Sequence, residues 1–148
     1  MEVVSREEFR VIGVELTDAE RRSYLIMQLW VSLCPKLRLV QHQVEPRILY
    51  GVWRQVPGDD QPRYVVGVQV PELEAVPEGM VGVTVPASRF VVAVHRGNMA
   101  RIGETYQAIT SWMREAGAEH NEAATFEVYD TTQPVTDGYA VPIYEPIK

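Results

Sequence analysis

The stretch with the strongest chemical character is ATFEVYD, residues 124–130, which places a carboxylate among aromatic side chains. Its residues alternate as in a β-strand, so Glu127 and Tyr129 share one face while Phe126 lies on the other. If the first face is exposed, Glu127 is an ordinary solvated carboxylate. If that face lines a cavity, the carboxylate can attract a cation, as neighbouring aromatic rings also do. Alternation alone leaves both interpretations open.

Aromatic residues recur in the segments that would flank a groove beside this strand. Tyrosine adds a hydroxyl group that can orient a ligand or a carboxylate. Packing in the core is the other explanation, and it applies to each of them. The set comprises Tyr50, Trp53, Tyr64, Tyr106, Trp112, Phe126, Tyr129, Tyr139 and Tyr144.

The other reactive residue types form no known motif. His42, His95 and His120 are far apart and fit no metal-binding spacing, and the sequence has no glycine-rich phosphate loop and no GxSxG motif. We therefore expect neither a metal site nor a cofactor. The single cysteine, Cys34, stands among apolar residues in WVSLCPKL, which favours a buried, unreactive thiol.

Composition indicates a globular protein of 148 residues, with 46% hydrophobic and 23% charged residues. No apolar run approaches the ~18 residues that span a bilayer, and the start, MEVVSREEFR, lacks a secretory signal pattern, so we expect a cytoplasmic protein. The formal net charge is −6 and the basic residues form no cluster beyond ERRS. Direct binding of nucleic acid is therefore not expected.

Hydrophobic periodicity predicts the order strand, helix, strand, strand in the first half of the chain. Apolar positions at helical spacing end at Pro35, which predicts a helix over about 18–33. The three strands are expected at about 9–16, 47–55 and 63–70.

The second half repeats this order. A strand at 88–97 precedes a helix that Asn98 caps and Gly117 ends. The strands ATFEVYD and YAVPIYEPI follow, and Pro142 and Pro146 favour an edge position or a bulge for the last strand.

A proline-rich segment, residues 71–85, connects the halves as an ordered connector or as a mobile lid, and its apolar end from Met80 to Val85 is a candidate for a short extra strand. Helices on one face of a mostly antiparallel sheet give an α+β fold. We expect one domain over residues 1–148, with two β-α-β-β halves at about 1–75 and 80–148 related by pseudo-two-fold symmetry. Such halves leave a central ligand groove between them.

The order of short motifs resembles the GyrI-like, or AraC-type effector-binding, domain family. The matching features in residues 86–148 are a strand ending in His-Arg-Gly, a helix with Tyr106 and the pair Ser111-Trp112, the FExY strand and a terminal IYxPI strand. In the first half, YGVWR and YVVGVQV are also similar to the family, so the resemblance covers nearly the whole chain.

The resemblance implies a duplicated β-α-β-β unit around a central groove. In family members fused to DNA-binding domains, the groove senses drug-like compounds, many of them cationic and aromatic, and a glutamate in the ExY strand meets the positive charge. Carried over, that glutamate is Glu127. The resemblance places the pocket aromatics among Tyr50, Trp53, Tyr64, Trp112, Phe126, Tyr129 and Tyr144.

The leading hypothesis is thus a multidrug-type domain that binds amphipathic, cationic aromatic compounds. No room remains for a helix-turn-helix module before Phe9 or after Lys148, so we expect a stand-alone domain whose regulatory output needs a protein partner. Some single-domain relatives hydrolyse strained, cyclopropane-bearing toxins with a groove glutamate, and others inhibit DNA gyrase. Both alternatives stay open, and internal neutralisation of Glu127 by Arg54 or Arg101 would remove the cation site.

Overall fold

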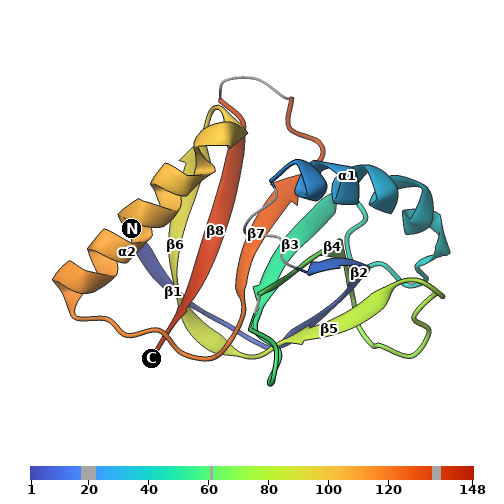
Figure 1. The fold of residues 1–148 in the computed structure, drawn as a ribbon, viewed down its shortest axis with the longest axis horizontal. Helices are drawn as coiled ribbons and strands as arrows, with labels where there is room; N and C mark the ends of the chain where they lie inside the picture. The colour runs from blue at the N-terminus through green and yellow to red at the C-terminus, as the bar shows by residue number, and fades with distance from the viewer. Residues whose placement is uncertain (18–22, 61, 135–137) are drawn as a thin grey trace.

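Alternating β-branched and aromatic residues form one curled antiparallel sheet in the part of the chain that the computed structural model describes, residues 1–17, 23–60, 62–134 and 138–148 (Figure 1). The strands are β1 (Glu2–Arg6), β2 (Phe9–Thr17), β3 (Ile48–Arg54), β4 (Arg63–Val70), β5 (Val81–Val85), β6 (Ser88–Arg96), β7 (Thr125–Asp130) and β8 (Ala140–Ile147). Their order across the sheet is β1-β6-β8-β7-β3-β4-β2-β5. The α+β fold predicted from the sequence is therefore confirmed.

The duplication is visible in the strand order. In each half the first strand pairs with the third and the third pairs with the second, giving β2-β4-β3 and β6-β8-β7. Antiparallel pairing of β3 with β7 joins the halves, with Gly51 opposite Glu127. The two outer strands cross over: β1 precedes β2 in the chain but pairs with β6, whereas β5 precedes β6 but pairs with β2.

Each half contributes one α-helix within the described residues, α1 (Ser23–Leu33) and α2 (Ile102–Ala116). The predicted start of the first helix at residue 18 lies outside the described residues. Asn98 caps a short 3-10 turn, Met99–Arg101, that leads into α2, and Gly117 ends α2 with a left-handed φ of 66°, which glycine adopts without strain. Both predicted end signals of this helix are thus confirmed.

Pro35 does not end the first helical segment outright, because a 3-10 helix, Cys34–Leu39, continues directly from α1. Cys34 is exposed there, with its thiol near the carbonyl oxygen of Trp30, so the expectation of a buried thiol is wrong. The apolar neighbours Leu33 and Leu37 turn towards the core instead, which leaves the residue after Leu33 on the outer side.

Strand β8 lies inside the sheet between β6 and β7, which corrects the expected edge position. It pairs with β6 over its whole length, but with β7 only at Ile143 and Tyr144. Pro142 and Pro146 flank this short ladder, so their missing N–H groups fall outside the pairing with β7. The interior position is therefore compatible with both prolines.

The connector ends in β5, which confirms the predicted extra strand at Val81–Val85. Earlier in the connector, Leu73 packs against the core, and its Cδ2 atom lies 2.9 Å from the place that a Cβ atom would take at Gly82. Residues 81–85 are thus part of the sheet.

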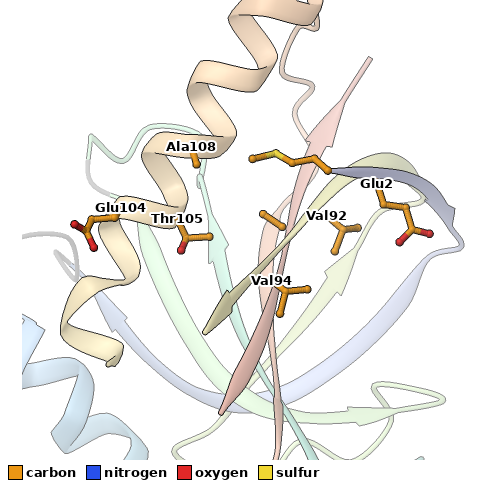
Figure 2. A pocket seen from close by; sticks show the side chains of 8 residues that line it. Glu2, Val92, Val94, Glu104, Thr105 and Ala108 are labelled. Atoms are coloured by element: carbon orange, nitrogen blue, oxygen red, sulfur yellow. The ribbon is translucent and has the colours of Figure 1, made fainter. Parts of the chain in front are cut away.

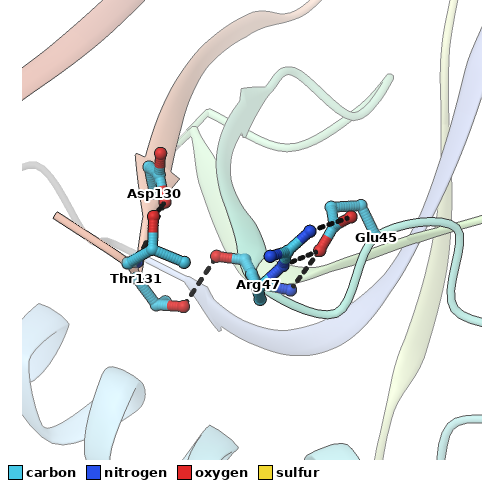
Figure 3. Close-up of polar contacts among 5 residues, drawn as sticks. Glu45, Arg47, Asp130 and Thr131 are labelled. Carbon is cyan, nitrogen blue, oxygen red and sulfur yellow. Dashed lines mark hydrogen bonds and ion pairs between the residues drawn. The ribbon is translucent and has the colours of Figure 1, made fainter.

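Hydrogen bonds tie the two halves together where β3 and β7 meet their loops (Figure 3). The carbonyl oxygen of Arg47 accepts hydrogen bonds from the backbone N–H and the hydroxyl of Thr131, at 2.9 and 2.7 Å. The guanidinium group of Arg47 donates two bonds to Glu45, at 2.7 and 3.2 Å. These contacts fix one end of the central strand pair.

Both α-helices lie on one face of the sheet, here called the helix face. α1 contacts β2 and β4, while α2 contacts β6, so the central strands β3 and β7 run between the two helices (Figure 1). The hydrophobic core under α1 includes Leu49 and Trp53 of β3 and Tyr129 of β7, whereas the core under α2 is built on β6 and β8. The other side of the sheet, here called the opposite face, carries a third core cluster that includes Phe9, Phe90 and Phe126.

Candidate functional site

Glu127 lies on the helix face of β7 and is buried, with 4% of its surface exposed. Residues directly opposite on paired strands share a face, and Glu127 is opposite Gly51 of β3 and Ile143 of β8. The carboxylate therefore stands at the junction of the two halves. Of the two interpretations that alternation left open, the structure shows the buried one.

Four neutral donors surround the Glu127 carboxylate. The hydroxyls of Tyr64 and Tyr129 donate to Oε1 at 2.6 and 2.7 Å. The hydroxyl of Tyr106 and the indole Nε1 of Trp53 donate to Oε2, the latter at 3.2 Å. Because a carboxylate offers about four lone-pair sites, its acceptor capacity is filled. We call these five residues the Glu127 cluster.

No basic residue neutralises this carboxylate: among the ion pairs of the described residues, none includes Glu127. Arg54 pairs with Glu15, and Arg101 pairs with Glu104 at 2.7 Å. The internal neutralisation considered from the sequence is therefore not what the structure has. Burial of a charge that only neutral donors satisfy leaves a negative potential in the site.

The tyrosines of the cluster are held in their protonated, donating form. Burial, followed by the charge of Glu127, raises the pKa values of Tyr64, Tyr106 and Tyr129 well above the ordinary value of 10. Tyr64 is the most enclosed of the three, with 1% of its surface exposed. The donors therefore keep their protons throughout the physiological range.

Gly51 makes room for the cluster. A Cβ atom at this position would lie 2.1 Å from the hydroxyl oxygen of Tyr64 and 2.9 Å from Oε1 of Glu127. Only a residue without a side chain fits between these groups. The sequence carried a signal for this constraint, since a glycine inside a strand pattern often marks a close approach of other atoms.

A groove adjoins the cluster. A cavity of about 220 Å³ is lined by Trp53, Tyr106, Thr125 and Glu145. A larger hollow of about 880 Å³ shares three of these residues and extends over the loops 54–59 and 120–123. Trp53 and Tyr106 also donate to Glu127, so their side chains connect the cavity with the buried carboxylate.

Glu145 is a second carboxylate in this groove, with 12% of its side chain exposed. The hydroxyl of Thr125 donates to its Oε2 at 2.9 Å, and Nδ1 of His120 lies 2.8 Å from its Oε1. Burial raises the pKa of Glu145, and the contacts with Thr125 and His120 oppose that rise.

Three of the seven aromatics predicted for the pocket, Trp53, Tyr64 and Tyr129, meet at Glu127. Trp30 of α1 supports Tyr129 from the side, with ring centroids 4.7 Å apart. The structure therefore gathers residues from both halves around one carboxylate.

The other four predicted aromatics do not reach Glu127. Phe126 and Tyr144 stack on the opposite face with ring centroids 4.5 Å apart, and Tyr50 packs in the same cluster. Their strand positions explain this, since Tyr50 is opposite Val128 and Tyr144 is opposite Phe126, one residue out of phase with Glu127. Trp112 is a residue of α2 and packs against the core of the second half.

Sequence reasoning left Tyr106, Gly51 and Glu145 out of the site. Tyr106 stood among the aromatics expected to flank the groove but not among those assigned to the pocket. Glu145 stands two residues after Ile143, and this spacing puts it on the face of Glu127 once the pairing of β7 with β8 is known.

A further hollow, of about 650 Å³, lies away from this site, between α2 and the strands β1 and β6. Figure 2 shows Glu2, Val92 and Val94 on its strand side, with Glu104 and Thr105 on α2. None of its lining residues belongs to the Glu127 cluster. It offers no buried charge to a ligand.

Two other kinds of functional feature are absent from the described residues. Within the described residues, no group of three or more His, Cys, Asp or Glu side chains is placed to hold a metal ion. No helix in that part of the chain is long and apolar enough to cross a membrane.

Comparison with known proteins identifies the family of this fold and site. A model of the GyrI-like small molecule binding domain matches residues 1–148. The transcriptional regulator BrlR of Pseudomonas aeruginosa is 34% identical over 148 residues, which are 98% of this chain and 54% of the regulator. The chain thus spans about half the length of this relative.

Solved structures share the architecture at lower identity. SAV2435 bound to tetraphenylphosphonium superposes with a TM-score of 0.80 at 14% identity, over 99% of this chain and 93% of that chain. The C-terminal domain of EcmrR gives a TM-score of 0.70 at 14% identity, over 99% and 96%. At these identities the likeness concerns the fold alone. The family match over the whole chain and the BrlR relationship show that this chain belongs to the GyrI-like small molecule binding domain family.

Proposed function

We propose that the groove beside the Glu127 cluster binds an amphipathic aromatic cation and that Glu127 supplies the counter-charge. The observation that carries the proposal is a buried carboxylate with four neutral donors and no paired cation among the described residues. The protein acts in the cytoplasm as a ligand-binding domain, without direct contact with nucleic acid.

Charge attraction between a bound cation and Glu127 would be of useful size. A cation about 5 Å from the carboxylate gains about 3 kcal/mol at an effective dielectric constant of ~20. The aromatic walls formed by Trp53 and Tyr106 add apolar contact and cation–π attraction. A neutral compound of the same shape gains the contact but not the charge term.

The hydrogen bonds of Glu127 favour one type of cation. Both carboxylate oxygens already accept two bonds, so an ammonium group could bond to them only by displacing a tyrosine or the tryptophan. A phosphonium or quaternary ammonium ion has no N–H group and needs only the electric field. Tetraphenylphosphonium, which is bound in the structure of SAV2435, is an ion of this type.

The same geometry weighs against the hydrolase hypothesis. A general base must accept a proton from water through a free lone pair. Glu127 has its acceptor capacity filled and is almost completely buried. Binding therefore accounts for the site better than hydrolysis does.

The test is calorimetric titration of tetraphenylphosphonium and of neutral triphenylphosphine oxide into the wild type, Glu127→Gln and Glu104→Gln. Glu104 is an exposed residue of α2, so its replacement controls for the loss of one surface charge. We expect Glu127→Gln to weaken binding of the cation by ~100-fold, the equivalent of about 3 kcal/mol, and binding of the neutral compound by much less. Glu104→Gln should bind as the wild type does.

Two results would contradict the proposal. One is equal affinity of the wild type for the cation and the neutral compound. The other is undiminished cation affinity in a Glu127→Gln protein whose thermal unfolding shows that it is folded. Thermal unfolding is an independent check, since a ligand at a hundred times its Kd adds about 2.7 kcal/mol of stability, and no stabilisation of the wild type by the cation would also contradict the proposal.

A further inference from the structure

Glu145 shares the helix face with Glu127 but stands in a different chemical situation. It follows Ile143, the residue opposite Glu127, by two positions, and it lines both the small cavity and the larger hollow. Its side chain is 12% exposed, so it meets the groove directly, whereas the groove reaches Glu127 only across Trp53 and Tyr106.

The two carboxylates differ in their free acceptor capacity. From the part of the chain that the structure describes, Glu127 receives four hydrogen bonds, while Glu145 has two polar contacts, one from Thr125 to Oε2 and one with His120 at Oε1. About two lone-pair sites of Glu145 are therefore free for a ligand that lies in the cavity. Its raised pKa, caused mainly by burial, agrees with a carboxylate that its own neighbours compensate only in part.

His120 is the internal group that a ligand would compete with. Its side chain is 60% exposed, and it stands at the mouth of the larger hollow next to Asn121 and Glu122. An exposed side chain can rotate away at little cost, so the contact with Glu145 is replaceable.

We infer that Glu145 forms a second anionic subsite, which binds a hydrogen-bonding cationic arm, such as a protonated primary amine, on a ligand whose aromatic cation is attracted by Glu127. The inference rests on the proposed function and refines it by assigning different tasks to the two carboxylates. Glu127 provides a field for a cation without donors, and Glu145 provides lone pairs for a donor. The ligand class is therefore an aromatic cation with a short alkylamine arm.

The experiment compares two phosphonium ions of matched size, n-butyltriphenylphosphonium and (3-aminopropyl)triphenylphosphonium. They differ by the exchange of a terminal methyl group for an ammonium group. We expect the wild type to bind the aminopropyl ion at least ~10-fold more tightly, which is the equivalent of one charge-assisted hydrogen bond. Glu145→Gln should abolish that preference, measured as the ratio of the two affinities within one protein, because both ions lose the attraction of one groove carboxylate equally.

Two further variants sharpen the assignment. Glu122→Gln removes an exposed carboxylate from the lining of the same hollow and should keep the wild-type preference. His120→Ala removes the competing imidazole and should strengthen binding of the aminopropyl ion only. This second variant also tests the inference if Glu145→Gln fails to fold.

The outcomes separate the two proposals. Equal affinity of the wild type for both ions, or a preference that survives in Glu145→Gln, overturns the subsite; the proposed function then stands if both ions still require Glu127. Failure of both ions to bind overturns the subsite and the proposed function together. A preference lost in Glu122→Gln as well as in Glu145→Gln would show a diffuse charge effect and would also overturn the subsite.

Discussion

The two faces of strand β7 carry aromatic rings around charges of opposite sign. On the helix face, three tyrosines and a tryptophan surround Glu127. On the opposite face, the guanidinium carbon of Arg6 lies 4.6 Å from the ring centroid of Phe9, 5.2 Å from that of Phe126 and 5.6 Å from that of Tyr144. On the helix face, the anion Glu127 accepts hydrogen bonds from the hydroxyl and indole N–H groups of the rings. On the opposite face, the cation Arg6 lies over the faces of the rings.

This difference shows that aromatic residues alone do not define a site for cations. The rings of the opposite face already contact a cation that the protein itself provides. The helix face has a carboxylate that no described basic residue pairs with, and its charge is available to a ligand. The charge that is already present decides which aromatic cluster can bind a cation from solution.

The largest expected effect is a loss of folding stability at alkaline pH, caused by the tyrosines of the helix face. Folding raises the pKa values of Tyr64, Tyr106 and Tyr129, so their contribution to stability is complete below their unfolded pKa of about 10 and is lost as the pH rises above it. At about pH 11 the loss should reach at most about 4 kcal/mol, because each tyrosine kept protonated one pH unit above its ordinary pKa costs about 1.4 kcal/mol.

Urea unfolding from about pH 9 to about pH 11, with tyrosinate absorbance followed in parallel, checks this. Three of the seven tyrosines should ionise only as the protein unfolds. The denatured protein is the control and should ionise in one step. Complete ionisation of the folded protein near pH 10 would show that the hydroxyls around Glu127 are less enclosed than the structure has them.

A smaller effect is expected from Gly51→Ala. The added methyl group would displace the hydroxyl of Tyr64 from Glu127, so the free energy of unfolding should fall by about 1–3 kcal/mol and cation binding should weaken. Gly103→Ala is the matched control, because a Cβ atom there meets no atom within 4 Å and Gly103 lies in α2. That control should be neutral or more stable by about 0.5–1 kcal/mol. Equal stability of the two variants in chemical denaturation would contradict the close packing at Gly51.

The smallest effect is expected from Arg6→Met, which keeps an apolar stem over the rings but removes the charge. The loss of cation–π attraction at a partly exposed site should cost about 0.5–1 kcal/mol of unfolding free energy. Affinity for tetraphenylphosphonium should not change, since the groove lies on the other face. If this variant weakened cation binding as much as Glu127→Gln does, the two faces would not be independent.

Much of the fold followed from local sequence patterns. Alternation and turn residues located the strands β2 to β8 to within about two residues, and Asn98 and Gly117 marked the second helical segment. Strand β1, Glu2–Arg6, was not predicted. The pattern FExY identified Glu127 as the residue to examine. Local patterns could not show its burial, because that depends on Tyr106 and Tyr64, which reach it from elements 21 and 63 residues away in the sequence.

The predicted aromatics that do not reach Glu127 share a physical cause. Alternation already separated Phe126 from Glu127, but a set of aromatics chosen by residue type ignored the phase of each strand. Assigning Tyr50 and Tyr144 to a face requires the register of β3 with β7 and of β7 with β8, which is a long-range property. The interior position of β8 follows from its pairing with β7, which is also a long-range property.

The crossed outer strands have a consequence for the origin of the fold. A half on its own would have an unpaired first strand, and two identical halves could pair it by exchanging their leading strands, as β1 and β5 do here. In such a homodimer, a carboxylate at the junction of the two halves would be present in two copies. Two like charges in one buried groove repel each other. When the halves are joined in one chain, their sequences can differ, so a single Glu127 lies opposite Gly51. This difference between the halves permits one buried charge at the centre.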